Sequence, residues 1–175
     1  MKRDLGLLAA REHDLLIVGG GIYGVAAAWD AAQRGLDVAL IEGEDFGAGV
    51  SWNSLKTIHG GLRHLQRADV GQMRESLRER RALLRIAPEL VRPLSFLVPA
   101  YGHGIRGREA LAAGLWLFDL LGRDRNRGLA PDQRIPPARS LSRRAVLEMI
   151  PALPERGLTG GALWTDAQVS SSERL

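Results

Sequence analysis

Two groups of residues in this sequence could do chemistry, and the first is a glycine fingerprint followed by a carboxylate. The pattern Gly19-x-Gly21-x-x-Gly24 precedes Glu42. In a dinucleotide site the first glycine permits a tight turn, the second lets backbone approach a pyrophosphate, and the third lets a helix pack closely on a strand. An acidic residue at about this distance accepts hydrogen bonds from ribose hydroxyls. The first group therefore predicts a dinucleotide site.

The second group combines basic side chains with a glycine pair. Its members are Ser54, Lys56, His59, Gly60, Gly61, Arg63 and His64. A glycine pair permits close approach of backbone to a flat ring, and arginine suits a phosphate or carboxylate. The group therefore favours recognition of an anionic small molecule. Taken singly, His59 could bond only the loop backbone, Arg63 could be a surface charge, and His64 could fill a partly buried space.

A βαβ unit must position the first group. Leu15–Val18 is a short apolar run, typical of a strand buried on both faces of a parallel sheet. The alanine-rich residues 22–34 end at Gly35, as a helix does, and Val38–Ile41 is typical of a second buried strand. The alternative is a glycine-rich turn in another α/β protein. Here strand, glycines, helix, strand and acid follow in the order that a dinucleotide fold requires.

Composition and charge exclude several classes of protein. The 175 residues suffice for one domain with a core, and 45% hydrophobic and 25% charged residues are ordinary for a globular protein. The 24 basic and 20 acidic residues give a net charge of +4, but no interleaved aromatics indicate a nucleic-acid partner. The absence of cysteine excludes disulfides and thiolate metal sites, and we predict no metal. We expect no signal peptide, because the N-terminal apolar run is too short, and no membrane-spanning helix, because no run of roughly 20 apolar residues occurs.

Three segments after the second group have distinct patterns. Residues 68–87 predict a helix whose charged side chains form a solvated face. Residues 94–98, which lie between two prolines, predict a strand, and residues 126–140 predict an exposed connector because they are rich in proline and show no period.

The remaining segments predict further helices and a strand. Ala110–Leu121 is either a core helix or a helix in a membrane interface, where neighbouring arginines would meet the headgroups. A short helix over 142–150 and a strand over 160–165 follow. The capping-box pattern of Ser170 and Glu173 announces one more helix, so we expect this sequence to be the N-terminal portion of a longer protein.

Three motifs resemble the FAD-dependent glycerol-3-phosphate dehydrogenases of the aerobic type. They are residues 14–22, the stretch Ser54-x-Lys-Thr-Ile-His-Gly-Gly-Leu-Arg63 and residues 79–88, and the resemblance extends to residues 161–168. The second motif is much more specific than the glycine fingerprint. The resemblance implies an α/β fold, namely a Rossmann-like FAD-binding domain of the glutathione-reductase and amino-acid-oxidase type. We expect that domain to be incomplete in this chain.

The resemblance also implies roles for the residues of both groups. Those implied to hold the ADP half of FAD are Gly19, Gly21, Gly24 and Glu42. Those implied to lie along the flavin are Ser54, Lys56, His59, Gly60 and Gly61. Arg63 matches the arginine that binds the substrate phosphate, and His64 adjoins it in the substrate pocket. No general base is assigned.

The family oxidises sn-glycerol 3-phosphate to dihydroxyacetone phosphate by hydride transfer to flavin N5, and the electrons pass to quinone or oxygen. By resemblance the protein is cytoplasmic, with a peripheral contact on the inner face of the cytoplasmic membrane. The implied divisions are an N-terminal extension (1–13), the first part of the FAD domain (14–100), a helical connector insertion (101–158) and the start of a substrate-binding region (159–175).

The sequence departs from the family at several positions. His64 stands where the family has tyrosine, and Tyr23 stands where it has asparagine. An altered substrate pocket would fit another FAD oxidoreductase of the same superfamily. Two further alternatives are an inactive truncated fragment and a nicotinamide-dependent enzyme, although the match over residues 56–63 favours a flavin.

Overall fold

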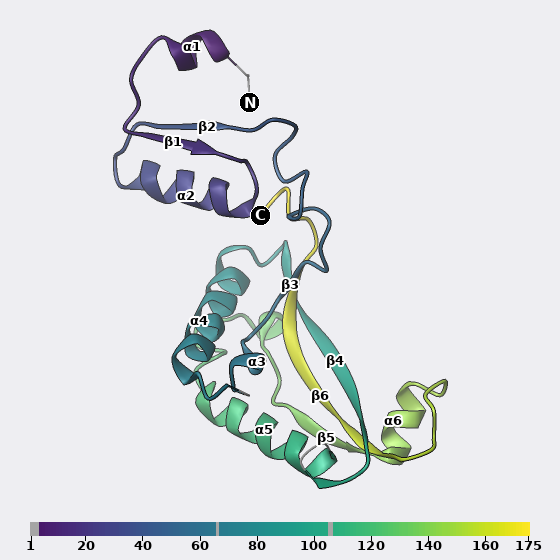
Figure 1. Ribbon diagram of the computed structural model, residues 1–175. Helices are drawn as coiled ribbons and strands as arrows, with labels where there is room; N and C mark the ends of the chain where they lie inside the picture. The colour runs from purple at the N-terminus through teal and green to yellow at the C-terminus, as the bar shows by residue number, and fades with distance from the viewer. Residues whose placement is uncertain (1–3, 66, 105–106) are drawn as a thin grey trace. The chain divides into compact units, whose positions relative to one another are not determined.

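The computed structural model describes residues 4–65, 67–104 and 107–175, which form two compact units (Figure 1). The first unit contains the residues up to Lys56 together with Ser171–Leu175, and the second contains Thr57–Ser170. Residues 1–3 of the predicted extension and 105–106 of the predicted insertion lie outside the described residues. The functional divisions predicted from the sequence stay predictions.

The first unit contains the predicted βαβ arrangement. Strands β1 (Leu15–Val18) and β2 (Val38–Ile41) pair in parallel. Helix α2 (Ile22–Gln33) connects them and lies against both strands (Figure 1). These three predicted elements are confirmed. A short helix α1 (Leu5–Ala9), which the sequence did not predict, precedes β1.

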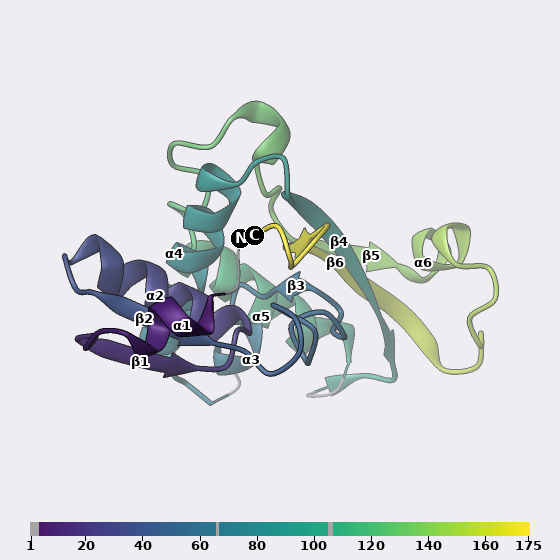
Figure 2. The ribbon, with the colours of Figure 1, turned by 90° about the horizontal axis from the view of Figure 1, so that it is seen from above.

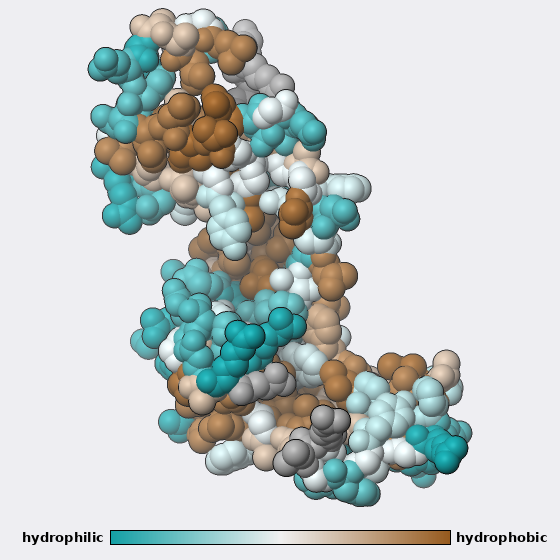
Figure 3. Space-filling view, viewed as in Figure 1, coloured by the Kyte–Doolittle hydropathy of each residue, from teal (hydrophilic) through white to brown (hydrophobic). Residues whose placement is uncertain are grey.

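The prediction that β1 is buried on both faces is wrong for the described chain. Leu16 and Val18 are exposed, and apolar surface is visible over the first unit in Figure 3. The reason is that only two strands and one covering helix make up this layer among the described residues. A short apolar run is typical of buried strands, but it does not specify how many neighbouring strands and helices cover the strand.

The second unit is built around the long strand β6 (Leu158–Val169), longer than the predicted residues 160–165. It pairs antiparallel with β3 (Thr57–Ile58) on one side and with β4 (Val91–Tyr101) on the other. Strand β5 (Arg139–Ser142) also pairs with β6, near its N-terminal end (Figure 2).

Strand β4 runs through both prolines that were expected to bracket it. Pro93 lies opposite Ala167 and Pro99 opposite Gly161. Within the described residues β4 pairs only with β6, so it forms an edge of the sheet. A proline, which lacks an N–H donor, is tolerated on an edge strand because that side of the ladder is not used.

Two helices pack their apolar sides into one cluster. Helix α4 (Val70–Ile86) confirms the predicted helix and is capped by Asp69, whose Oδ1 accepts a hydrogen bond from Gln72 N at 3.0 Å. Helix α3 (Leu62–Leu65) is a single turn, and its two leucines pack against the buried residues Met73, Leu77 and Phe118.

Helix α5 (Arg108–Leu121) buries Leu115 and Phe118 and exposes Trp116. One side of α5 therefore packs in the core, as the first of the two sequence interpretations expects. The membrane-interface interpretation stays a prediction. None of the helices in the described part of the chain combines the length and the apolar character needed to cross a bilayer.

The prediction of an exposed connector over residues 126–140 is wrong. Leu129 and Ile135 are buried in the core cluster that contains Leu84, and a 3₁₀ turn, η2 (Pro131–Gln133), lies between them. Asn126 explains this burial because its amide bonds both backbone groups of Ile135, at 2.7 Å to the N–H and 2.8 Å to the carbonyl. A loop can be buried when its backbone polar groups are satisfied in this way.

The last two helix signals of the sequence begin at Ser142 and Ser170. Helix α6 (Arg143–Met149) is confirmed, and its cap Ser142 accepts a hydrogen bond from Ala145 N at 3.2 Å. Residues 170–175 form no helix, and Ser171 Oγ donates instead to Glu173 Oε2 at 2.7 Å. A segment this short cannot offset the cost of helix nucleation.

Candidate functional site

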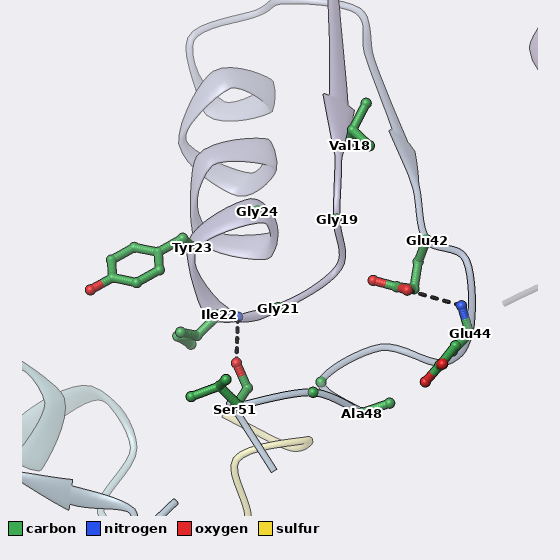
Figure 4. Close-up of a pocket in the computed structure, with 13 residues that line it drawn as sticks. Val18, Gly19, Gly21, Ile22, Tyr23, Gly24, Glu42, Glu44, Ala48 and Ser51 are labelled. Carbon is green, nitrogen blue, oxygen red and sulfur yellow. Dashed lines mark hydrogen bonds between the residues drawn. The ribbon is translucent and has the colours of Figure 1, made fainter. Parts of the chain in front are cut away.

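The first unit contains a pocket of about 450 Å³ where β1 and β2 end (Figure 4). Four predicted residues, Gly19, Gly21, Gly24 and Glu42, line it together with the loop over residues 47–51. Ligands of open parallel sheets bind beyond the carboxyl ends of the strands. The structure therefore brings the whole first group together at a position suited to a ligand.

Close packing of helix on strand explains Gly24. A Cβ atom at Gly24 would lie 1.9 Å from the carbonyl oxygen of Gly19, a distance no real contact allows. Gly19 itself has a φ of +106°, which favours glycine. The fingerprint thus has the turn and the helix–strand packing that its spacing predicts.

The Glu42 carboxylate braces the glycine loop. Its Oε2 accepts a hydrogen bond from Gly20 N at 2.6 Å, and its Oε1 accepts one from Glu44 N at 2.9 Å. The ribose role of Glu42 stays a prediction, and the structure adds a second role that the sequence did not indicate.

Ser51 is a pocket residue that the sequence analysis missed. Its Oγ accepts a hydrogen bond from Ile22 N at 2.9 Å, so it caps the N-terminus of α2 from a distant loop (Figure 4). Serine is a preferred helix cap because its oxygen satisfies an N–H group that has no partner within the helix. No local pattern marks it, because cap and helix lie 29 positions apart. Tyr23 also contributes to the lining, and its ring extends away from Glu42 in Figure 4.

Ser54 and Lys56 do not line this pocket, as far as the described residues show. Ser54 Oγ accepts a hydrogen bond from Lys56 N at 3.2 Å, and Lys56 has a φ of +53°, uncommon for a residue with a side chain. Lys56 Nζ lies 3.6 Å from Glu173 Oε1. Hydrogen bonds from Ser171 and from its own backbone, together with the charge of Lys56, lower the pKa of Glu173.

A second constellation, in the other unit, centres on the buried carboxylate of Asp166. Asp166 Oδ2 lies 3.0 Å from His59 Nδ1, and Asp166 Oδ1 accepts a hydrogen bond from Gly60 N at 2.8 Å. Arg80 Nη1 donates to the same Oδ1 and also to the Thr165 carbonyl at 3.2 Å. The Asp166 side chain is 4% exposed, whereas that of His59 is 69% exposed. The constellation thus joins a buried charge pair to a solvent-facing imidazole.

Arg80 is buried although its helix was expected to turn its charges to solvent. Its side chain is 1% exposed. Desolvation lowers the pKa of Arg80, while the Asp166 charge acts in the opposite direction and keeps the guanidinium paired. Burying such a pair requires nearly complete hydrogen bonding on both sides. Asp166 meets this requirement with partners on both of its oxygens, whereas Arg80 Nη2 has no hydrogen-bond partner among the described residues.

The glycine pair has a packing explanation within its own unit. A Cβ at Gly60 would lie 2.4 Å from Arg80 Nη1, and one at Gly61 would lie 2.9 Å from Ser76 Cβ. Gly61 also has a φ of +83°. Both glycines therefore let the backbone lie directly on α4. Their predicted proximity to a flat ring stays a prediction.

Arg63 and His64 lie in α3, which its flanking leucines anchor to the core. Arg63 is exposed, and in the described part of the chain it makes no ion pair. His64 is half-buried, and its backbone N–H donates to the Gly61 carbonyl at 2.9 Å. Arg63 is thus available to an anion, as its predicted role requires.

The sequence contains a signal that Arg80 is buried. Buried residues of α4 fall at 73, 77, 80 and 84, so the arginine interrupts an apolar stripe. A charge at such a position indicates a buried partner. Asp166 similarly interrupts the apolar run of β6. The pattern marks both residues as unusual, but it does not say that they meet.

Comparisons with known proteins show the family of this chain. The family model of FAD dependent oxidoreductases (DAO) matches residues 14–175. A glycerol-3-phosphate dehydrogenase of Synechocystis sp. is 42% identical over 163 residues, which are 93% of this chain and 28% of that protein. Glycerol-3-phosphate dehydrogenase 2 of Mycobacterium bovis is 38% identical over 166 residues, 94% of this chain and 27% of its own length.

A solved structure is also similar. The glycerol-3-phosphate dehydrogenase of Bacillus halodurans, determined in complex with FAD, aligns with a TM-score of 0.61 and 25% identity over 97% of this chain and 24% of that chain. The present chain therefore spans between a quarter and a third of the length of the curated relatives described above. Because the family model covers nearly all of the sequence, the chain belongs to the FAD dependent oxidoreductase (DAO) family.

Proposed function

We propose that the first unit binds the ADP half of FAD. Its pocket fits that group because the glycine-lined rim lies at the N-terminus of α2, where the partial positive charge of the helix favours a pyrophosphate. Glu42 lines the same pocket, and its carboxylate is the kind of group that accepts hydrogen bonds from ribose hydroxyls. The residues proposed to hold the cofactor here are Gly19, Gly21, Gly24, Glu42 and Ser51.

The proposed contacts to the flavin come from the second group of residues. They are Ser54, Lys56, His59, Gly60 and Gly61. When bound, FAD supplies the redox step by accepting a hydride from the substrate carbon. The protein contributes orientation, a site for the hydroxyl proton and electrostatic complementarity to the substrate.

The proposed reaction is oxidation of sn-glycerol 3-phosphate to dihydroxyacetone phosphate. The observation that carries it is the 42% identity over 163 residues to a glycerol-3-phosphate dehydrogenase. In support, Arg63 is an exposed cation suited to a phosphate, and His64 adjoins it. Acceptance of electrons by quinone or oxygen, a cytoplasmic location and a peripheral membrane contact belong to the same proposal.

We further propose His59 as the general base. Its Nδ1 is engaged by Asp166, and among the described residues its Nε2 has no hydrogen-bond partner. An exposed imidazole oriented by a buried carboxylate is suited to accepting a proton from a substrate hydroxyl. His59 Nε2 would take the C2 hydroxyl proton while the hydride leaves C2, so that a ketone forms.

The experiment that tests this function has two parts. Flavin released from the denatured protein is identified, and reduction of a dye acceptor is then followed with glycerol 3-phosphate, glycerol and L-proline. Bound FAD together with activity that requires the phosphate is expected. FAD with equal activity on an unphosphorylated compound would point to another substrate. A folded protein that retains no FAD even when FAD is added would contradict the cofactor assignment.

A further inference from the structure

The two oxygens of Asp166 have different partners. Oδ1 receives two donors, the guanidinium of Arg80 and the backbone N–H of Gly60, whereas Oδ2 faces His59 Nδ1 at 3.0 Å. The three partners come from two parts of the chain, residues 59–60 and helix α4, and lie 86 to 107 positions from Asp166. Asp166 is therefore held at one oxygen and presents the other to the imidazole.

This division determines which nitrogen of His59 carries the proton. An ionised carboxylate only accepts hydrogen bonds, so the imidazole nitrogen that faces it must be the protonated one. In a neutral imidazole the other nitrogen is then an acceptor. The contact with Asp166 Oδ2 consequently leaves the lone pair on His59 Nε2, the nitrogen on the opposite side of the ring.

We propose that Asp166, held by Arg80 and Gly60 N, is a positioning residue that fixes neutral His59 in the Nδ1–H tautomer with Nε2 as its proton-accepting atom. The functional meaning of this tautomer rests on the proposed function. The tautomer itself does not, because it follows from hydrogen bonds within the second unit alone.

The variant Asp166→Asn tests the proposal with little change in shape. Two donors converge where Oδ1 lies, so the amide oxygen of asparagine is expected to occupy that position. The amide NH₂ group would then face His59 Nδ1 and donate to it. The imidazole would adopt the Nε2–H form, which cannot accept a proton at Nε2. A comparable substitution in serine proteases leaves geometry intact and lowers kcat about 10⁴-fold through the wrong tautomer.

The first measurement is NMR of the protein labelled with ¹⁵N-histidine. The sequence contains four histidines, and the spectrum of His59→Gln assigns His59. The spectra are recorded at rising pH until the His59 signals stop changing, so that the neutral imidazole is the form observed. The wild-type protein is expected to show Nδ1–H, and Asp166→Asn is expected to show Nε2–H. A wild-type His59 in the Nε2–H form overturns the proposal without any variant.

Kinetics give the second readout. Asp166→Asn is expected to lower kcat for glycerol 3-phosphate by roughly 10²- to 10⁴-fold while KM and bound FAD change little. Arg80→Lys, which keeps the charge, is expected to retain the Nδ1–H form and most of the activity. Leu84→Ala, one turn further along α4, is the packing control and is expected to lower stability but leave kcat unchanged.

The outcomes separate the two proposals. Protein with FAD bound and no glycerol 3-phosphate activity would contradict the proposed function, while the wild-type tautomer would still decide the role of Asp166. A wild-type Nδ1–H tautomer that persists in folded Asp166→Asn would overturn the positioning role even in an active enzyme. Loss of kcat in Leu84→Ala equal to that in Asp166→Asn would overturn it as well, because packing alone would then explain the effect.

Discussion

Arg80 and Asp166 lie 86 positions apart and form a buried ion pair in which Arg80 Nη1 donates to Asp166 Oδ1. The pair joins α4 to β6, and the backbone N–H of Gly60 donates a hydrogen bond to the same carboxylate oxygen. It therefore links the core of the second unit to the imidazole at its surface.

Removal of this arginine should strongly destabilise the second unit. Arg80→Ala leaves Asp166 as a buried unpaired charge, and breaking one partner of such a pair costs about 3–5 kcal/mol. Urea unfolding measures the loss. Arg78→Ala, an exposed neighbour on the same helix, should change the free energy of unfolding by less than about 0.5 kcal/mol. Equal effects of the two substitutions would show that the ion pair is not special.

A methyl group at Gly24 should disrupt the nucleotide pocket. In Gly24→Ala the new Cβ would lie 1.9 Å from the Gly19 carbonyl, so α2 and the glycine loop must separate. We expect FAD affinity to fall by about tenfold or more, which equals about 1.4 kcal/mol. Titration followed by flavin fluorescence measures it. Gly43→Ala is the matched control, because open space surrounds that position; unchanged affinity in Gly24→Ala would contradict the packing argument.

Loss of the Glu42 carboxylate should weaken FAD retention in two ways. Glu42→Ala removes the acceptor for Gly20 N and Glu44 N, which loosens the loop, and it removes the proposed ribose acceptor. Loss of the acceptor for the part-buried Gly20 N costs about 1 kcal/mol. The flavin content after dialysis is the measurement. A variant that keeps all of its flavin would remove Glu42 from the ribose site, and Glu44→Ala serves for comparison because its side chain is not assigned that role.

Substitution of Arg63 should separate substrate binding from cofactor binding. Arg63→Ala should raise KM for glycerol 3-phosphate about 10- to 100-fold, or about 1.4–2.8 kcal/mol, because a cation that faces the phosphate is lost. Bound FAD should remain unchanged. Arg67→Ala removes an exposed arginine just after the same helix and should have little effect. Unaltered kinetics in Arg63→Ala would exclude the phosphate role.

Parts of the fold followed directly from local sequence. The βαβ unit was predictable because each of its signals, from the apolar run of β1 to the glycine after α2, lies within a few residues of the element that it specifies. The same holds for α4, whose Asp69 cap and apolar stripe are local features. Residues 54–63 resemble a motif of FAD-dependent enzymes, and the match of the FAD dependent oxidoreductase model to the chain supports that resemblance.

Other parts of the fold depended on contacts with residues distant in the sequence, which a local sequence pattern cannot indicate. The edge position of β4 explains its two prolines, and the amide of Asn126 explains the buried loop that follows it. Neither feature could be deduced from composition, because edge position and side-chain capping are decided by the assembled sheet and core.

The sequence by itself determined the dinucleotide-binding class and most of the residues proposed to contact FAD and substrate. Only the tertiary structure decided that Ser51 caps α2, that Glu42 braces the glycine loop, and that Asp166 orients His59. The physical reason is the range of the interactions: helix and strand periods act over a few residues, whereas these hydrogen bonds join groups 22 to 107 positions apart.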